Sequence, residues 1–242
     1  MSTEPDTIYS QPLEAITGFV FDQSVVRVFQ DMIGRSVPGY ATLVSMLPVL
    51  AQQYVQTDSR CYDLGCSLGA VTLALRHSIT QRNVSIVAID NSPDMVKQCN
   101  TLLNQTHHPL PVSLLCADIT CTDIDNASLV VMNFTLQFIS PEKRQQLINK
   151  IYAGLKPGGA LVLSEKLAFT SDEQELMTAL HQKFKKLNGY TDLEISQKRS
   201  ALDNVLISDS LLTHQQRLLS SGFKSANIWF QCFNFASILA VK

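Results

Sequence analysis

Apolar runs alternate with helical patterns between residues 59 and 166, and this alternation is the strongest constraint on the fold. RCYDL, VSIVAID, PVSLLCAD, ASLVVMNF and GALVLSEK are strand-like runs with few polar interruptions. Among the helical segments between them, SPDMVKQCNTLLNQ and SPEKRQQLINKIYAGL begin with Ser-Pro, a favoured helix start. Strands that are apolar on both faces and alternate with helices are typical of a parallel sheet covered on both sides. The sequence therefore predicts an α/β fold.

Helical segments flank this core. FDQSVVRVFQDMI and YATLVSMLPVLAQQY predict two helices before it, so we expect residues 1–58 to form an N-terminal helical cap. After it, S-D-E-Q at Ser171 has a capping-box pattern, and with LEISQKRSALDNVL it predicts a helical insertion over residues 171–210. LLTHQQRLLSSGF predicts a helix that leads to two strands, NIWFQCF and FASILAVK, antiparallel through a turn near Asn234. No linker is recognisable, so the 242 residues predict a single domain.

The composition argues against several classes of protein. The net charge is −2, and the densest basic run, Lys183 to Lys186, is typical of a solvated helix face, so we expect no direct nucleic-acid contact. No apolar run approaches the ~20 residues that span a bilayer, and the polar N-terminus lacks a signal-peptide layout, which predicts a cytoplasmic protein. The cysteines form no CxxC pair, and His107 and His108 lie in a loop without a partner at ligand spacing, which predicts no metal site.

The first predicted strand runs into the glycine-rich stretch DLGCSLG, Asp63 to Gly69. Gly65 permits a tight turn, and backbone N–H groups at the start of the next helix can then face a polar ligand group. A plain strand–helix connection would also explain the turn. The spacing G-x-S-x-G, with Ser67 at the middle position, disfavours a dehydrogenase, whose pyrophosphate site has the pattern G-x-G-x-x-G.

Three further polar side chains end the next three strands. Asp90 can accept from both hydroxyls of a ribose, and Asp118 can accept from an exocyclic amino group such as that of adenine, while Asn133 interrupts the run VVMNFTL. Each alone has an ordinary structural explanation: a charge at a helix N-terminus, an Asx turn, or a polar core residue. Because parallel strands end at one edge of a sheet, together they predict a pocket for an adenosine-containing ligand.

These stretches resemble known motifs. DLGCSLG is similar to the first motif of class I S-adenosylmethionine-dependent methyltransferases, IDNSPDM to their second motif, and LKPGGALVLSE to their turn into the fifth strand. The resemblance implies a Rossmann-like, mostly parallel seven-stranded sheet with its last strand antiparallel. RSVPGY, CYDLGCSLG, AIDNSP, NFTLQF, LEISQKRS and WFQCFNF together resemble the bacterial carboxy-S-adenosylmethionine synthases over nearly the whole chain. LEISQKRS and WFQCFNF are not general methyltransferase motifs.

This second resemblance implies an activity. Members of the family convert S-adenosyl-L-methionine and prephenate to carboxy-S-adenosyl-L-methionine and phenylpyruvate, without a metal. A separate tRNA carboxymethyltransferase then uses the product to make uridine oxyacetic acid at the wobble position. The resemblance also implies a homodimer, for which residues 171–210 are the expected interface.

The resemblance implies site residues as well. In SQKRS, it assigns Arg199 to the carboxylate carried by the modified sulfonium, and a planar guanidinium suits bidentate carboxylate binding. Without the resemblance, a solvated helix charge would be the favoured explanation of Arg199. The implied contacts to S-adenosylmethionine come from Tyr40, Gly65, Cys66, Ser67, Asp90, Asn91, Asp118, Ile119 and Asn133.

Two other functions would use the same pocket. One is an ordinary methyltransferase acting on a small molecule or tRNA, for which Arg199→Ala would leave methyl transfer intact. The other is a non-catalytic protein that binds an S-adenosylmethionine derivative as a sensor or carrier. The absence of a recognisable protein base fits this second alternative, which turnover of prephenate would exclude.

Overall fold

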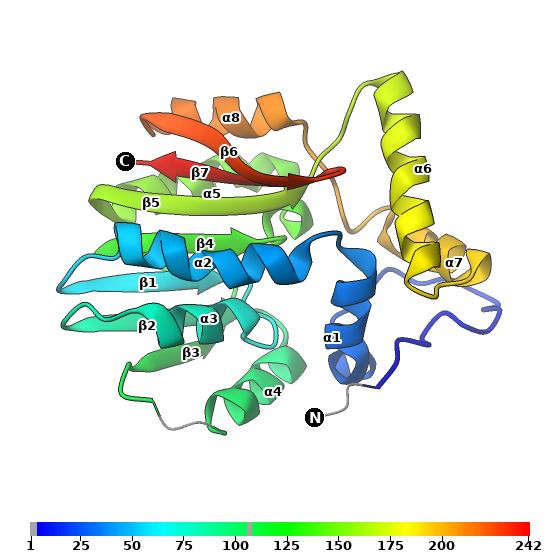
Figure 1. The fold of residues 1–242 in the computed structure, drawn as a ribbon, viewed down its shortest axis with the longest axis horizontal. Coiled ribbons are helices and arrows are strands. Elements are labelled where there is room, and N and C mark those ends of the chain that lie inside the picture. The colour runs from blue at the N-terminus through cyan, green and yellow to red at the C-terminus, as the bar shows by residue number, and fades with distance from the viewer. Residues whose placement is uncertain (1–3, 106–107) are drawn as a thin grey trace.

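A computed structural model of the protein describes residues 4–105 and 108–242, so the first three residues of the expected cap and His107 lie outside the described residues. A seven-stranded sheet in the order β3-β2-β1-β4-β5-β7-β6 forms the centre (Figure 1). All strands are parallel except β7, which is antiparallel to both β5 and β6. The predicted sheet and its antiparallel closing strand are thus confirmed. The strands are β1 Ser59–Leu64, β2 Val84–Asp90, β3 Val112–Cys116, β4 Ala127–Asn133, β5 Leu155–Lys166, β6 Ser225–Cys232 and β7 Phe235–Val241.

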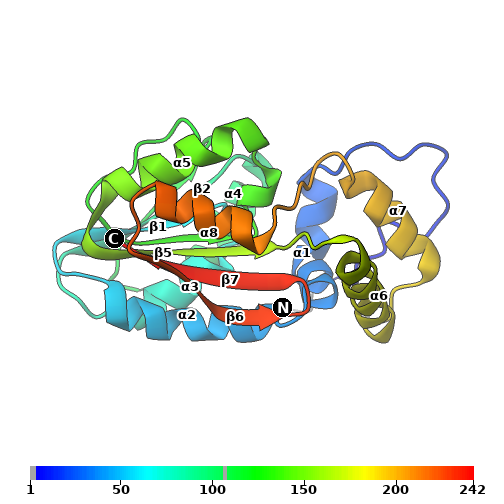
Figure 2. The ribbon, with the colours of Figure 1, turned by 90° about the horizontal axis from the view of Figure 1, so that it is seen from above.

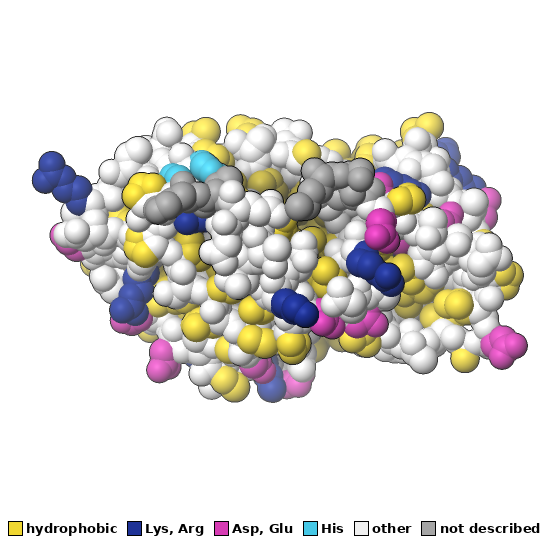
Figure 3. Space-filling view, turned by 90° about the horizontal axis from the view of Figure 1, so that it is seen from below, with side chains coloured by type: hydrophobic (Ala, Val, Ile, Leu, Met, Phe, Trp, Pro, Cys, Tyr) yellow, Lys and Arg dark blue, Asp and Glu magenta, His cyan; other side chains and the backbone are white. Residues whose placement is uncertain are grey.

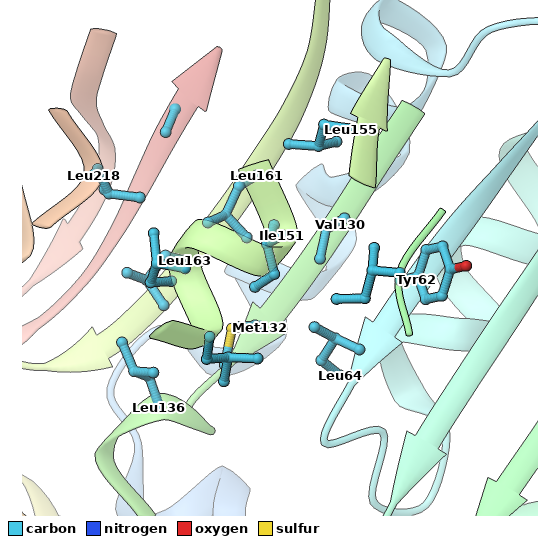
Figure 4. Packing of buried hydrophobic residues seen from close by; sticks show 14 of the residues in the cluster. Tyr62, Leu64, Val130, Met132, Leu136, Ile151, Leu155, Leu161, Leu163 and Leu218 are labelled. Atoms are coloured by element: carbon cyan, nitrogen blue, oxygen red, sulfur yellow. The ribbon is translucent and has the colours of Figure 1, made fainter. Parts of the chain in front are cut away.

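Helices cover both faces of the sheet, as predicted (Figure 2). One face packs against α2 (Tyr40–Tyr54), α3 (Ala70–Ser78) and α4 (Pro93–Leu103), and the other against α5 (Pro141–Gly154) and α8 (Leu211–Ser220). Alternate residues of each strand supply the two cores, because successive side chains point to opposite faces. In β1, Cys61 faces α2 and α3, whereas Tyr62 and Leu64 lie in the core on the α5 side (Figure 4).

Two helix starts show which sequence signals decided the local structure. Ser92 caps α4 as predicted, because its Oγ accepts from the N–H of Met95 at 3.2 Å. The predicted capping box at Ser171 is wrong. Thr170 has the extended N-cap conformation, so Ser171 is already the first residue of α6 (Ser171–Leu187). The real capping box precedes α7 (Asp192–Leu202), where Thr191 and Glu194 bond each other's backbone N–H groups.

Three helices stand beyond the carboxyl ends of the parallel strands, at the right of Figure 1. These are α1 (Gln23–Ser36), α6 and α7. The N-terminal segment is hydrogen-bonded to α7, because the Gln197 side chain donates to the carbonyls of Tyr9 and Gln11 at 3.0 and 2.8 Å. Parts of the expected cap and insertion therefore meet over the strand ends, whereas α2 lies on the sheet itself.

The surface shows little segregation of charge on the face in Figure 3, where lysine and arginine side chains are scattered among acidic and apolar ones. No helix in the described part of the chain has the length and apolar character needed to cross a membrane. In the same residues, no group of three or more His, Cys, Asp or Glu side chains is arranged to hold a metal ion.

Candidate active site

The strand order creates a crevice between β1 and β4. The chain moves outward from β1 to β3 and then returns to β4 on the other side of β1, so the connections at the carboxyl ends of these two strands diverge. A cavity of about 240 Å³ lies there, between the strand ends and the helices beyond them. It brings together most of the predicted contact residues, namely Gly65, Ser67, Asp90, Asn91, Asp118, Ile119 and Asn133.

The loop after β1 has a demanding backbone. Gly65 has φ +83°, and a Cβ there would lie 2.2 Å from Oγ1 of Thr135, so the position excludes a side chain. Ser67 also has positive φ, at 50°, which is uncommon for residues other than glycine. Its N–H donates to Oδ2 of Asp90 at 2.9 Å. Ser67 therefore occupies a glycine-like position while tying the loop to the end of β2.

Both acids of the predicted pocket have their orientation set by backbone donors. The other oxygen of Asp90, Oδ1, accepts from the N–H of Ser92 at 3.0 Å, and burial raises the pKa of Asp90. The carboxylate of Asp118 accepts from the N–H of Thr120 at 2.8 Å, a bond that holds the pKa of Asp118 below its usual value. Asp90 therefore does stabilise a helix start and Asp118 does form an Asx turn. Both acids also line the cavity, so these structural roles are compatible with ligand binding.

Two buried oxygens near the crevice lack a partner in the described residues. Oδ1 of Asn133 lines the cavity wall from the end of β4, and Oδ1 of Asp63 lies in β1. The second oxygen of Asp63 accepts from the Thr72 hydroxyl at 2.5 Å, and burial raises the pKa of Asp63 to about 7. An unpaired buried acceptor costs ~1–3 kcal/mol, so Asn133 suits a ligand with a donor such as an ammonium group, whereas Asp63 is fully buried and does not line the cavity.

Three of the expected contact residues do not line the cavity. The Cys66 thiol is buried against Cys99, and this contact together with burial raises its pKa, so only the backbone of Cys66 belongs to the loop surface. The Tyr40 ring stands 6.4 Å, centroid to centroid, from Phe134, which does line the cavity. Arg199 is exposed on α7, but together with burial, the larger cause, its positive charge lowers the pKa of Lys166, a cavity residue.

The rest of the cavity wall was missed from the sequence. It combines aromatic rings with cationic or basic side chains that come from elements far apart along the chain. The interpretation of Lys183 to Lys186 as a solvated helix face is wrong for Lys185, which lines the cavity from α6. Only the aromatic and lysine content of the cap and insertion could have hinted at this wall. Its aromatic members are Phe19, Phe21, Phe29, Phe134, Phe138 and Phe235, and its basic members are Lys166, His181, Lys185 and Lys198.

Comparison with known proteins identifies the family. A model of a methyltransferase domain matches residues 62–159. The carboxy-S-adenosyl-L-methionine synthase of Trichlorobacter lovleyi is 54% identical over 244 residues, which cover 100% of both chains. The chain belongs to the carboxy-S-adenosyl-L-methionine synthase family. The synthase of Erwinia tasmaniensis is likewise 54% identical, over 98% of this chain and 97% of its own. The predicted resemblance to this family of enzymes is therefore confirmed.

Solved structures agree on the fold. Human N-acetylserotonin methyltransferase in complex with S-adenosylmethionine superposes with a TM-score of 0.60 at 17% identity, over 90% of this synthase-family chain and 56% of that chain. Magnesium protoporphyrin IX methyltransferase from Synechocystis gives a TM-score of 0.60 at 15% identity, over 87% of each chain. These distant likenesses confirm the class I methyltransferase fold.

Proposed function

We propose that the protein converts S-adenosyl-L-methionine and prephenate to carboxy-S-adenosyl-L-methionine and phenylpyruvate. One cavity carries this function, because acceptors suited to a nucleoside and an ammonium group adjoin a chamber of aromatic and cationic side chains. Sequence identity of 54% over nearly the whole chain to enzymes named carboxy-S-adenosyl-L-methionine synthase supports the choice of product.

The strand-end residues suit the parts of S-adenosylmethionine in order along the sheet. Asp118, after β3, would accept from the adenine amino group, and Asp90, at the end of β2, from the ribose hydroxyls. The unpaired oxygen of Asn133, on β4, would accept from the ammonium group of the methionine part. The sulfonium would then lie near the β1–β4 crevice and face the chamber under α1, α6 and α7.

The sulfonium makes its methyl C–H acidic, and prephenate releases carbon dioxide and hydroxide as its ring becomes aromatic. The hydroxide takes a methyl proton to form water, and the resulting carbon nucleophile bonds to carbon dioxide. This balance needs no oxidant and no protein base. Binding both substrates in one cavity would contribute proximity, and the bound substrates would displace water from it. Arg199 is close enough to Lys166 and Lys185 to interact electrostatically with both. It would bind the new carboxylate from the rim of the cavity.

The proposed function extends to the assembly and location of the protein. Leu176, Leu187 and Leu193 are exposed on the insertion over residues 171–210, which fits a homodimer interface there. We also propose a cytoplasmic protein that releases its product to a separate tRNA carboxymethyltransferase. The modest net charge of −2 is consistent with a protein that does not itself bind tRNA.

The decisive experiment supplies S-adenosylmethionine and prephenate labelled with carbon-13 in the ring carboxylate. We expect labelled carboxy-S-adenosylmethionine and an equimolar amount of phenylpyruvate, detected by mass spectrometry. Arg199→Ala should bind S-adenosylmethionine normally but form little carboxylated product. Unlabelled product would refute the carbon dioxide transfer, and formation of S-adenosylhomocysteine with a methylated acceptor would favour an ordinary methyltransferase.

A further inference from the structure

A group of basic side chains lines the cavity wall opposite the strand-end acids. Lys166 is the last residue of β5, His181 and Lys185 belong to α6, and Lys198 belongs to α7. We refer to these four residues as the basic wall. They come from three elements, yet all border the same cavity.

Two of the four side chains of the basic wall already have polar partners within the protein. Nζ of Lys198 lies 3.3 Å from Oδ2 of Asp6 and 3.1 Å from Oγ of Ser36. The His181 ring bonds the Ser36 carbonyl at 2.8 Å through Nε2. By contrast, neither Lys166 nor Lys185 has an ion pair or a side-chain hydrogen bond in the part of the chain that the structure describes.

The surroundings of these two lysines favour an anion. Burial and the nearby charges of Lys198, Lys166 and Arg199 lower the pKa of Lys185 to about 7. Burial and the charge of Arg199 lower the pKa of Lys166 as well. Unpaired positive charges that are partly withdrawn from water are costly, and a bound carboxylate would offset that cost.

The position of Lys166 separates it from the nucleoside part of the cavity. In the sheet, β5 follows β4, and Asn133 is paired with Ser164, so Lys166 lies two residues further toward the carboxyl edge. Along that edge, the acids after β3 and β2 come first, then the β1–β4 crevice, and then Lys166. Phe29 of α1 and Phe21 of the segment before it also line the cavity.

We infer that Lys166 and Lys185 bind a carboxylate of the second substrate, a small cyclic dicarboxylate whose ring packs against the phenylalanine side chains. Lys198 is already paired with Asp6 and Ser36, so it is not part of the inferred carboxylate site. The inference rests on the proposed function, in which that dicarboxylate is prephenate. It adds the residues that select the second substrate.

The test measures binding of prephenate to the full chain saturated with S-adenosylhomocysteine, which has no methyl group to react. Lys166→Met and Lys185→Met remove the charge and keep a long side chain. Each should weaken prephenate binding about tenfold or more, the usual effect of losing a charge-assisted hydrogen bond. The Kd for S-adenosylhomocysteine should not change, which also shows that the variants fold. Lys183→Met is the matched control, because Lys183 is exposed on the same helix and should leave both Kd values unchanged.

Each other outcome has one meaning. Unchanged prephenate binding in both variants overturns the inference. An equal loss of S-adenosylhomocysteine binding in a variant that keeps the wild-type circular dichroism spectrum also overturns it, because the lysines then do not act on the second substrate alone. If the wild-type protein turns prephenate over and the variants keep its KM, the proposed function stands and the subsite falls. If the wild-type protein binds prephenate through these lysines without forming carboxylated product, the subsite stands and the proposed function falls.

Discussion

At the scale of single residues, Asp90 provides the sharpest test of the nucleoside site. Its two oxygens accept from the N–H groups of Ser67 and Ser92, so in Asp90→Asn the amide NH2 would face one of these donors. Loss of the charge and of that bond should raise the Kd for S-adenosylmethionine about tenfold to a hundredfold, measured by calorimetry. Asp123→Asn, at an exposed position, is the control. An unchanged Kd for Asp90→Asn would show that the carboxylate does not contact the ligand.

Gly65 tests the backbone of the same loop. In Gly65→Ala, the new Cβ would meet Thr135 at 2.2 Å in a conformation with φ +83°. The combined conformational and steric strain should lower the free energy of unfolding by about 2–4 kcal/mol in urea denaturation, with loss of S-adenosylmethionine binding. Gly34→Ala is a suitable control, since nothing lies within 4 Å of its added Cβ and the position is helical. That variant should be neutral or slightly more stable.

The residues of this site were predictable to different degrees. Asp90, Asp118 and Asn133 were predicted because a strand end is visible in the sequence and parallel strands end together. The buried thiol of Cys66 and the inward orientation of Lys185 were not, because side-chain direction depends on the loop path and on how α6 packs. Local periodicity carries no information on either.

At the scale of elements, Arg144 joins α5 to the segment that leads into α8. Its guanidinium is fully buried, pairs with Asp209 at 2.7 Å and donates to the carbonyls of Ile139 and Ile207 at 2.8 and 2.9 Å. Arg144→Met should lower the free energy of unfolding by about 3 kcal/mol, because it leaves buried acceptors unpaired while Arg217 still pairs with Asp209. Urea denaturation measures the change. Arg60→Met, which removes an exposed ion pair, should cost less than about 1 kcal/mol, and equal losses would contradict this account.

The elements themselves were largely predicted, and their contacts were not. The strands of the core and the helices between them follow from apolar periodicity, which both faces of a buried sheet impose. The capping box was predicted at Ser171 but forms at Thr191, because both stretches carry the pattern and only the backbone conformation of the preceding residue decides between them. That α2 covers the sheet whereas α1 stands over the strand ends is likewise a result of tertiary packing.

At the scale of the whole molecule, the basic wall exists only because distant segments meet. Asp6 from the N-terminal segment and Ser36 from the end of α1 hold Lys198 of α7, while Lys166 ends β5 and Lys185 comes from α6. No stretch of sequence contains this group, which explains why the sequence predicted the strand-end residues and missed the basic wall. In the proposed function, the helices beyond the strand ends turn the nucleoside-binding edge into a chamber for two substrates.

This arrangement predicts a pH dependence for the second substrate. Lys185 has a pKa of about 7 without an anion, so it loses its proton as the pH rises through neutrality and then binds a carboxylate less well. His181 does not titrate in that range, because burial lowers its pKa to about 3. The KM for prephenate should therefore rise between about pH 6 and about pH 9, while the Kd for S-adenosylmethionine changes little. In Lys185→Met the KM should be high throughout, with a flatter profile, and a flat wild-type profile would contradict the role of Lys185.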